Sequence, residues 1–310
     1  CRSGARFFPR HGARRLNASF GIDHPLLATH DIEGLRNRLI SLGFNMTAIG
    51  KHPWGTSTSL AMFDGCLLEI MGIYDETLID EVPAGEFRFG RHVFEHLQQR
   101  EGVALSALHS TDSVQDAATA QKAGFTVSGY LEFGRDVTLP DGSADRTKTT
   151  LALLPDLDFT RLSFFLCQQH RPELIYVPEW LEHPNTVNGI SGVTILAKAE
   201  QLETLKAKLT GLYGGASPLN GGFSVQTANG QMSVQTLDAI QAEFGTLPSD
   251  IAESATPSIV AMDLVYQNAT TFEVWVAKSS MNLSSTASGR YATQPQDTAN
   301  VILRFGRIDT

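Results

Sequence analysis

Hydrophobic and polar positions change their period in the middle of residues 22–44. The first part alternates in the manner of a β-strand as far as Asp31, and the remainder has apolar residues three or four positions apart, as in a helix with one buried face. An Asp at the start of such a stretch can accept the free backbone N–H groups, and Gly43 stands where a left-handed residue often ends a helix. The helical apolar positions are Ile32, Leu35, Leu39 and Leu42. The pattern therefore predicts a strand followed by a helix.

The same order of strand, Asp, helix and Gly-Phe recurs in residues 103–125. A third copy begins at Gly189, and strand-like segments follow each helix, which gives a repeated βαβββ unit. A fourth, degenerate unit is predicted in residues 258–308, with strands at 258–267, 271–277 and 299–308 and without a helix of its own. The predicted fold class is α+β.

Four such units pair into two domains, and the length of 310 residues suits two cores of ordinary size. We expect the first domain over residues 21–185 and the second, degenerate pair over 186–310, with the boundary after the His-Pro-Asn turn at 183–185. An inserted helix is expected at about 76–101. Residues 1–20 are rich in Arg and are predicted to form a disordered basic leader.

Composition narrows the class of protein. A net charge of −9 with dispersed basic residues argues against nucleic-acid binding, and no apolar stretch approaches the roughly 18 residues of a membrane-spanning helix. The three cysteines are too few for a disulfide framework, and Cys66 and Cys167 lie in apolar runs that predict buried, reduced thiols. We therefore expect a cytoplasmic protein that binds neither nucleic acid nor a membrane; a homodimer is an open alternative.

A series of short motifs, in a fixed order, resembles the glyoxalase-like domain family of the vicinal-oxygen-chelate superfamily. The motifs are Ile22-Asp23-His24, Leu42-Gly43-Phe44, His52-Pro53-Trp54-Gly55-Thr56, Leu68-Glu69 and His183-Pro184-Asn185. The resemblance implies that paired βαβββ units form cupped, incomplete β-barrels with helices on the outside and a divalent metal on the floor.

The resemblance assigns His24 and Glu69 as metal ligands, with Fe, Mn, Zn, Ni or Mg as the candidate ion. Imidazole and carboxylate suit these metals, and an open coordination position would let a substrate bind through two neighbouring oxygens. Glu69 is notable without the resemblance, because a carboxylate within an apolar strand needs a partner or a metal. The competing interpretation of His24 is a strand histidine bonded to a backbone carbonyl.

Further site residues are predicted around these two. Glu69 and His52 are the candidate catalytic groups, and the candidate ligand-binding residues are Trp54, Thr56, His170 and Arg171. An exposed turn is the alternative for His52, and a charged strand end is the alternative for His170 and Arg171.

The second unit departs from the family pattern, because Leu105 stands where His24 would be and the last strand has no carboxylate. The candidates to complete the ligand set are Gln169, His170, His109 and His183. The sequence therefore favours a metal-assisted lyase, isomerase or dioxygenase acting on a small oxygenated molecule. The alternative is a protein that has lost its metal and binds a small molecule in the same cup.

Overall fold

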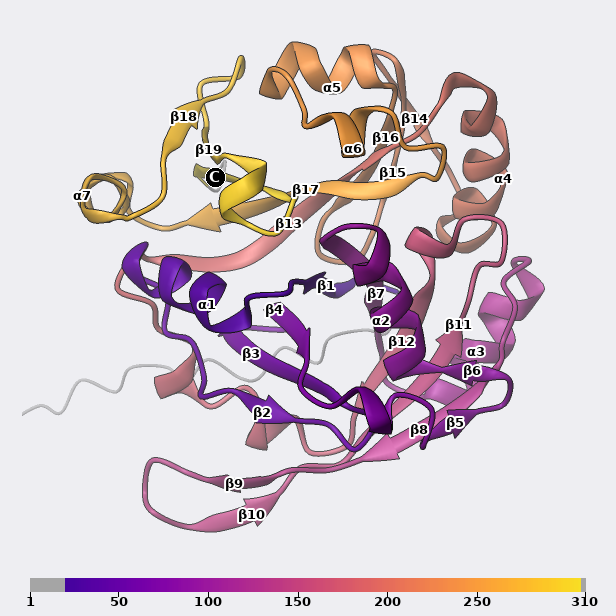
Figure 1. Ribbon diagram of the computed structural model, residues 1–310, viewed down its shortest axis with the longest axis vertical. Coiled ribbons are helices and arrows are strands. Elements are labelled where there is room, and N and C mark those ends of the chain that lie inside the picture. The colour runs from indigo at the N-terminus through magenta and orange to yellow at the C-terminus, as the bar shows by residue number, and fades with distance from the viewer. Residues whose placement is uncertain (1–19, 308–310) are drawn as a thin grey trace, which may run out of the picture.

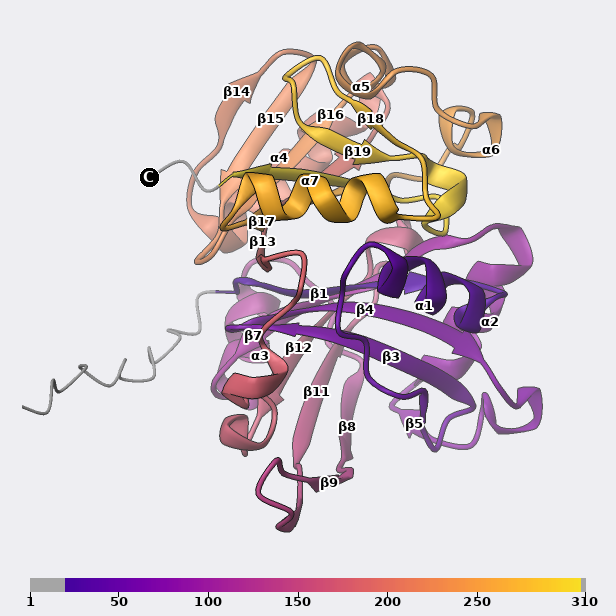
Figure 2. The same cartoon turned by 90° about the vertical axis from the view of Figure 1, so that its left-hand side faces the viewer.

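The computed structural model describes residues 20–307, which form two eight-stranded sheets, one above the other in Figure 1 and Figure 2. The expected basic leader lies almost entirely outside the described residues. The first sheet has the strand order β2 (Gly50–Lys51), β3 (Thr56–Phe63), β4 (Cys66–Ile73), β1 (Ile22–Ala28), β7 (Gly102–Ser110), β12 (Phe164–Gln169), β11 (Thr149–Leu154) and β8 (Gly129–Phe133).

Each half of the first sheet is one βαβββ unit. The helix of the first unit is α1 (Ile32–Ser41), and that of the second is α3 (Ser113–Lys122). The predicted caps are present: the Asp31 carboxylate accepts from Gly34 N at 2.8 Å, and the Asp112 carboxylate accepts from Gln115 N at 3.0 Å. The predicted strand–helix order of both units is thus confirmed.

The two units meet at the centre of the sheet, where β1 and β7 pair antiparallel. Within each unit the first strand pairs parallel with the last, β1 with β4 and β7 with β12. Leu26 lies opposite Glu69 in one pair, and Ala107 lies opposite Phe165 in the other. The two units are therefore related by an approximate two-fold axis, and corresponding positions can be compared directly.

The first sheet is curled, and its two faces have different surroundings. On the outer face α1 and α3 pack with Leu35, Leu39, Ala117 and Ala120 in a core that continues into the second sheet. On the inner face lies α2 (Phe89–Gln99), the inserted helix, with Phe89, Val93 and Leu97 buried against strands β1 and β7. The paired units therefore form the expected cupped half-barrel, partly covered by α2.

The connections of the first sheet contain short elements. They are the 3-10 helices η1 (Glu76–Leu78), η2 (Thr160–Leu162), η3 (Pro172–Leu174) and η4 (Pro178–Trp180), the pair β5 (Pro83–Ala84) and β6 (Phe87–Arg88), and the hairpin β9 (Asp136–Thr138) and β10 (Ala144–Arg146). The β9–β10 hairpin projects from the first sheet on the side away from the second sheet (Figure 1).

The second sheet repeats the same scheme. Its strand order is β14 (Ser217–Leu219), β15 (Gly222–Gln226), β16 (Gln231–Gln235), β13 (Val187–Leu196), β17 (Ser258–Tyr266), β20 (Ile302–Arg307), β19 (Tyr291–Thr293) and β18 (Leu283–Ser285). Its helical elements are η5 (Ala199–Gln201), α4 (Leu202–Tyr213), α5 (Leu237–Phe244), α6 (Ser249–Ala252), α7 (Ala269–Lys278) and η6 (Pro295–Asp297). The division into domains at residues 185 and 186 stays a prediction.

The fourth unit has a helix, so the predicted strand at 271–277 is wrong. These residues belong to α7, where the Asn268 side chain accepts from Thr271 N at 2.9 Å as an N-cap. Their β-branched and aromatic composition is typical of a strand, but Phe272 is fully buried and stacks with Tyr266 at 4.6 Å between ring centroids. Packing of this one side chain outweighs the local preference for a strand.

Two further expectations from the sequence concern membrane-spanning helices and the cysteines. No helix among the described residues is long and apolar enough to cross a membrane. Cys66 and Cys167 are both buried and free, as predicted from the apolar runs around them.

Candidate functional site

The inner face of the first sheet encloses a cavity of about 660 Å³. His24, Glu69, His52 and Trp54 of the predicted site all line it. Most of the remaining wall is apolar, and residues from η3, η4 and the β9–β10 hairpin lie around the opening. A cavity of this size suits a small organic molecule.

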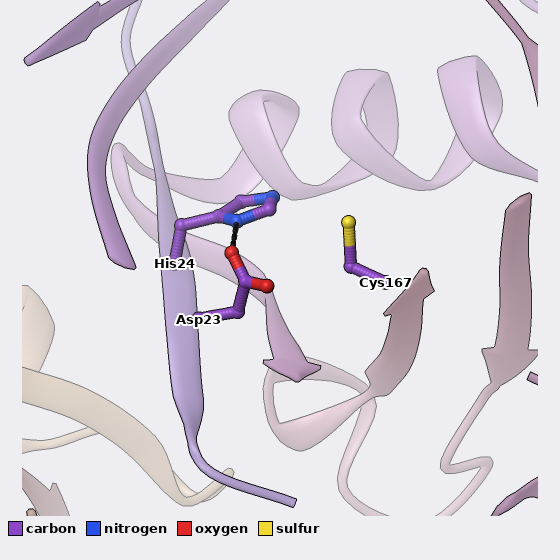
Figure 3. Close-up of side chains that lie close together, drawn as sticks. All are labelled: Asp23, His24 and Cys167. Carbon is purple, nitrogen blue, oxygen red and sulfur yellow. Dashed lines mark hydrogen bonds and ion pairs between the residues drawn. The ribbon is translucent and has the colours of Figure 1, made fainter. Parts of the chain in front are cut away.

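His24 is held by its neighbour in the chain. Its Nδ1–H donates to Asp23 Oδ1 at 2.5 Å, and both side chains are buried (Figure 3). Successive strand residues normally point to opposite faces, but the register of β1 against β7 shifts between Ile22 and His24, and the contact forms at this irregularity. The bond fixes the tautomer and leaves Nε2 as the second functional atom of the ring.

The pKa of His24 reflects opposing effects. Burial lowers it, while the charge and hydrogen bond of Asp23 and the charge of Glu69 raise it, and the net shift is above the ordinary value of 6.5. Without a metal, the two neighbouring carboxylates therefore favour the protonated ring more than water does.

Glu69 is oriented in the same manner. Thr58 of the adjacent strand β3 donates its hydroxyl to Glu69 Oε1 at 2.5 Å, which leaves Oε2 facing His24. The distance from Glu69 Oε2 to His24 Nε2 is 3.3 Å. His24 Nε2 and Glu69 Oε2 thus face each other in the cavity. The other ring nitrogen of His24 and the other carboxylate oxygen of Glu69 are each held by a hydrogen bond.

The second unit places apolar groups at the corresponding positions. Leu105 corresponds to His24, and Phe165, opposite Ala107 in the sheet, corresponds to Glu69. Phe165 packs edge-on against the His24 ring at 5.6 Å between centroids. The two-fold relation therefore supplies no second pair of ligands.

Cys167 supplies a further donor atom beside His24 and Asp23. It lies two residues beyond Phe165 on β12, and its Sγ is within 4.8 Å of donor atoms of His24 and Asp23 (Figure 3). Burial and the negative charges of Asp23 and Glu69 raise the pKa of this thiol well above its ordinary value. Asp23 Oδ2 is also buried, and it has no hydrogen-bond partner among the described residues.

A second polar group lies elsewhere in the cavity wall and is centred on Arg135, which follows β8. Its Nη2 donates to His52 Nε2. A guanidinium has no acceptor, so His52 Nε2 carries no proton, and Nδ1–H donates to Thr56 Oγ1 at 2.9 Å. The His52 ring stacks on Trp54 at 4.7 Å with an angle of 11° between the planes. Burial, then the charge of Arg135, holds the pKa of His52 well below its ordinary value.

Of the candidates to complete the ligand set, Gln169 lines the cavity, where its Oε1 accepts from the Thr149 hydroxyl at 2.7 Å. The other predicted residues lie outside the cavity wall, and they are Thr56, His109, His170, Arg171 and His183. Thr56 is buried behind His52, and His170 Nε2 is 2.7 Å from the Thr150 hydroxyl. Arg171 is exposed and pairs with Asp145 and Glu173. His183 connects Asn45 N to the Met62 carbonyl by its two ring nitrogens.

Asp23, Arg135 and Cys167 belong to the site and were not predicted. The position of Asp23 depends on the irregular pairing of β1, and Arg135 lies 83 residues after His52, in the other unit. The sequence gives one indication of Cys167. It lies two residues after Phe165, which corresponds to Glu69, and alternate residues of a strand point to the same face.

Comparisons with known proteins agree with this architecture. The family model described as "Glyoxalase-like domain" matches residues 22–212. No curated protein matches the sequence.

Similar folds occur among solved structures. A hypothetical protein from Staphylococcus aureus has a TM-score of 0.66 at 12% identity, over 93% of this chain and 99% of its own. A mutant of 4-hydroxymandelate synthase from Streptomyces coelicolor has a TM-score of 0.57 at 11% identity, over 92% and 91%. A fusion of a xylose isomerase-like TIM barrel with 4-hydroxyphenylpyruvate dioxygenase has a TM-score of 0.51 at 12% identity, over 92% of this chain and 49% of its own.

Proposed function

The chain belongs to the glyoxalase-like domain family, and from this we propose that it is a metal-assisted enzyme of the glyoxalase or dioxygenase type that acts on a small oxygenated molecule. His24 and Glu69 would hold the divalent metal in the cavity of the first sheet. The superfamily is represented among the structural relatives by 4-hydroxymandelate synthase and a 4-hydroxyphenylpyruvate dioxygenase fusion, whose names denote chemistry of this kind.

The observation that carries the proposal is the 3.3 Å separation of His24 Nε2 and Glu69 Oε2. Two donors bound to one ion at about 2.0–2.2 Å, with a tetrahedral or octahedral angle between them, lie roughly 2.8–3.6 Å apart. The two free donor atoms therefore already have the spacing of neighbouring ligands.

The surroundings of the two donors support the same assignment. A metal-bound histidine almost always donates its other ring N–H to a carboxylate or carbonyl, and metal-bound carboxylates are hydrogen-bonded in turn. Asp23 supplies the first contact at 2.5 Å, and Thr58 supplies the second. Both contacts leave the remaining donor atom, Nε2 or Oε2, free to bind an ion.

Cys167 is the proposed third ligand. Its thiol clusters with donor atoms of His24 and Asp23 but not of Glu69, so joining the His24–Glu69 pair on one ion requires the Cys167 side chain to move toward Glu69. Cys167 comes from the second unit, in which the positions corresponding to His24 and Glu69 are apolar. The charge of a bound metal deprotonates a coordinating thiol, which reverses the effect of burial on its pKa. Imidazole, carboxylate and thiolate together form a donor set that Zn²⁺ and related ions accept.

A bound metal would polarise a substrate oxygen and stabilise negative charge that develops on it. The protein itself would keep water out with the apolar wall and hold His24 and Glu69 rigid through Asp23 and Thr58. His52 uses both ring nitrogens in hydrogen bonds, so in this proposal it orients Arg135. A catalytic role for His52 stays a prediction from the sequence.

Metal analysis of protein purified without chelator tests the proposal. We expect a stoichiometric transition metal in the wild type or after reconstitution, and its loss in His24→Ala and Glu69→Gln. His170→Ala is the matched control, since this histidine lies outside the cavity wall and should leave the metal content unchanged. Failure of the wild type to take up any transition metal would refute the proposal.

The alternative is a metal-free protein that binds a small molecule in the same cavity, and the apolar Leu105 and Phe165 favour it. In that case His24→Ala and Glu69→Gln would fold normally and leave ligand affinity unchanged. A cytoplasmic location remains part of the proposal, because the two described cysteines are free thiols.

A further inference from the structure

We propose that the molecule bound in this cavity is a small organic anion, a carboxylate with an apolar body, and that Arg135 binds its charged group. The inference deepens the proposed function, since it names the substrate class of the same site.

Arg135 is the only Lys or Arg among the residues that line the cavity. Within the part of the chain that the structure describes, no carboxylate forms an ion pair with it. Its one side-chain hydrogen bond goes to His52, a neutral ring. A guanidinium has five N–H donors, so most of them are left for another partner.

The acidic residues around the cavity are engaged elsewhere. Glu69 is bonded to Thr58 and faces His24, and Asp136 pairs with Arg146 at 2.6 Å. Glu179, on the rim, is exposed to solvent. No carboxylate of the cavity wall therefore forms an ion pair with Arg135, and the charge of Glu69 acts on it only from a distance. A partly buried positive charge without a paired counterion is costly unless a ligand supplies one.

The guanidinium is also held in place. His52, fixed by its bond to Thr56 and by stacking on Trp54, contacts Nη2 from one side. Gly50 lies beside Nη1, and a Cβ at residue 50 would be only 3.0 Å from that atom. A planar guanidinium fixed in this manner is suited to bidentate binding of a carboxylate.

The remainder of the wall indicates an apolar or aromatic body. Trp54 and Phe133 meet edge to face beside Arg135 at 5.2 Å between centroids, and Phe89 and Phe165 continue the same surface toward His24. A ligand with its carboxylate on Arg135 would place its apolar part on these rings. The distal end of such a ligand would then face the His24–Glu69 pair.

Paired acids and amides of equal size provide the test. We would titrate arylalkanoates from phenylacetate to 1-naphthylacetate, and the corresponding neutral amides, into the full chain and follow binding by calorimetry and NMR. The wild type should prefer the acids by about tenfold to a hundredfold, the range for hydrogen bonds to a charged group. Arg135→Met should abolish that preference, and Arg135→Lys should keep part of it.

Arg91→Met is the matched control, because Arg91 pairs with Asp80, neither residue lines the cavity, and the preference should stay intact. Equal affinity of acids and amides in the wild type would overturn the inference. So would the absence of binding by every acid at about 10 mM, where a ligand with a Kd near 1 mM is largely bound. Metal content measured on the same proteins separates the two proposals, since Arg135→Met removes no proposed metal ligand.

Discussion

Thr58→Val tests the proposed metal ligands without changing any of them. The substitution keeps the volume of a fully buried side chain and removes only the hydroxyl that donates to Glu69 Oε1 at 2.5 Å. Hydrogen bonds to charged groups contribute about 1.5–3 kcal/mol. Loss of a partner that orients a metal ligand lowers metal affinity about 10- to 100-fold, or about 1.4–2.7 kcal/mol. The two estimates agree, so we expect an affinity loss in that range.

The assay is competition with a chelator of known affinity, with unfolding in urea measured on the same protein. Thr150→Val is the matched control, because Thr150 is a buried threonine outside the cavity wall whose hydroxyl contacts Glu132 and His170. It should leave metal affinity unchanged. If Thr58→Val and Thr150→Val bind metal equally tightly, Glu69 Oε2 is not a ligand and the reasoning from the 3.3 Å contact fails.

Three further predictions concern the buried groups. In metal-free protein, Asp23→Asn should lower the pKa of His24 in an NMR titration, because the lowering effect of burial is then opposed less. The stability that the wild type gains from its raised His24 pKa should be present below pH 6.5 and lost as the pH rises through the folded-state pKa. A pH-independent difference in stability between the two proteins would contradict this. Phe272→Ala should lower the free energy of unfolding in urea by about 3–5 kcal/mol, and Val274→Ala, at an exposed position, should change it by no more than about 0.5 kcal/mol. A strand at 271–277 would not predict this contrast. In metal-free protein the Cys167 thiol should react with a disulfide reagent only after unfolding, because burial raises its pKa; rapid reaction of the native protein would show that the cavity opens to it.

The sequence predicts those parts of the fold that depend on local patterns. Asp31 and Asp112 begin helices because their carboxylates reach backbone N–H groups within the next turn, and that spacing is visible in the sequence. His24 and Glu69 lie 3.3 Å apart, which the sequence allows because both belong to strands whose alternation and order are evident; their role as metal ligands stays a prediction. Residues 271–277 were not predicted correctly, because the burial of Phe272 against Tyr266 is a long-range contact.

The remainder of the site depends on contacts that alternation alone does not give. Strict alternation would direct Asp23 away from His24, and only the irregular register of β1 explains their contact. Arg135 follows an edge strand of the second unit, yet its partner His52 belongs to the first, so the pair appears only when the half-barrel closes.

The difference between the two sheets shows what the fold alone leaves undecided. Both have the same strand order, but the second has Gly192 where the first has His24, and its Arg304 is paired with Asp263 and Glu243. There α5 and α6 bury Ile240 and Ile251 against the inner face, whereas α2 covers only part of the first. The inserted segments therefore decide which half-barrel keeps a large cavity. The polar residues of one unit then decide what that cavity can bind, and the proposed chemistry belongs to the first sheet for both reasons.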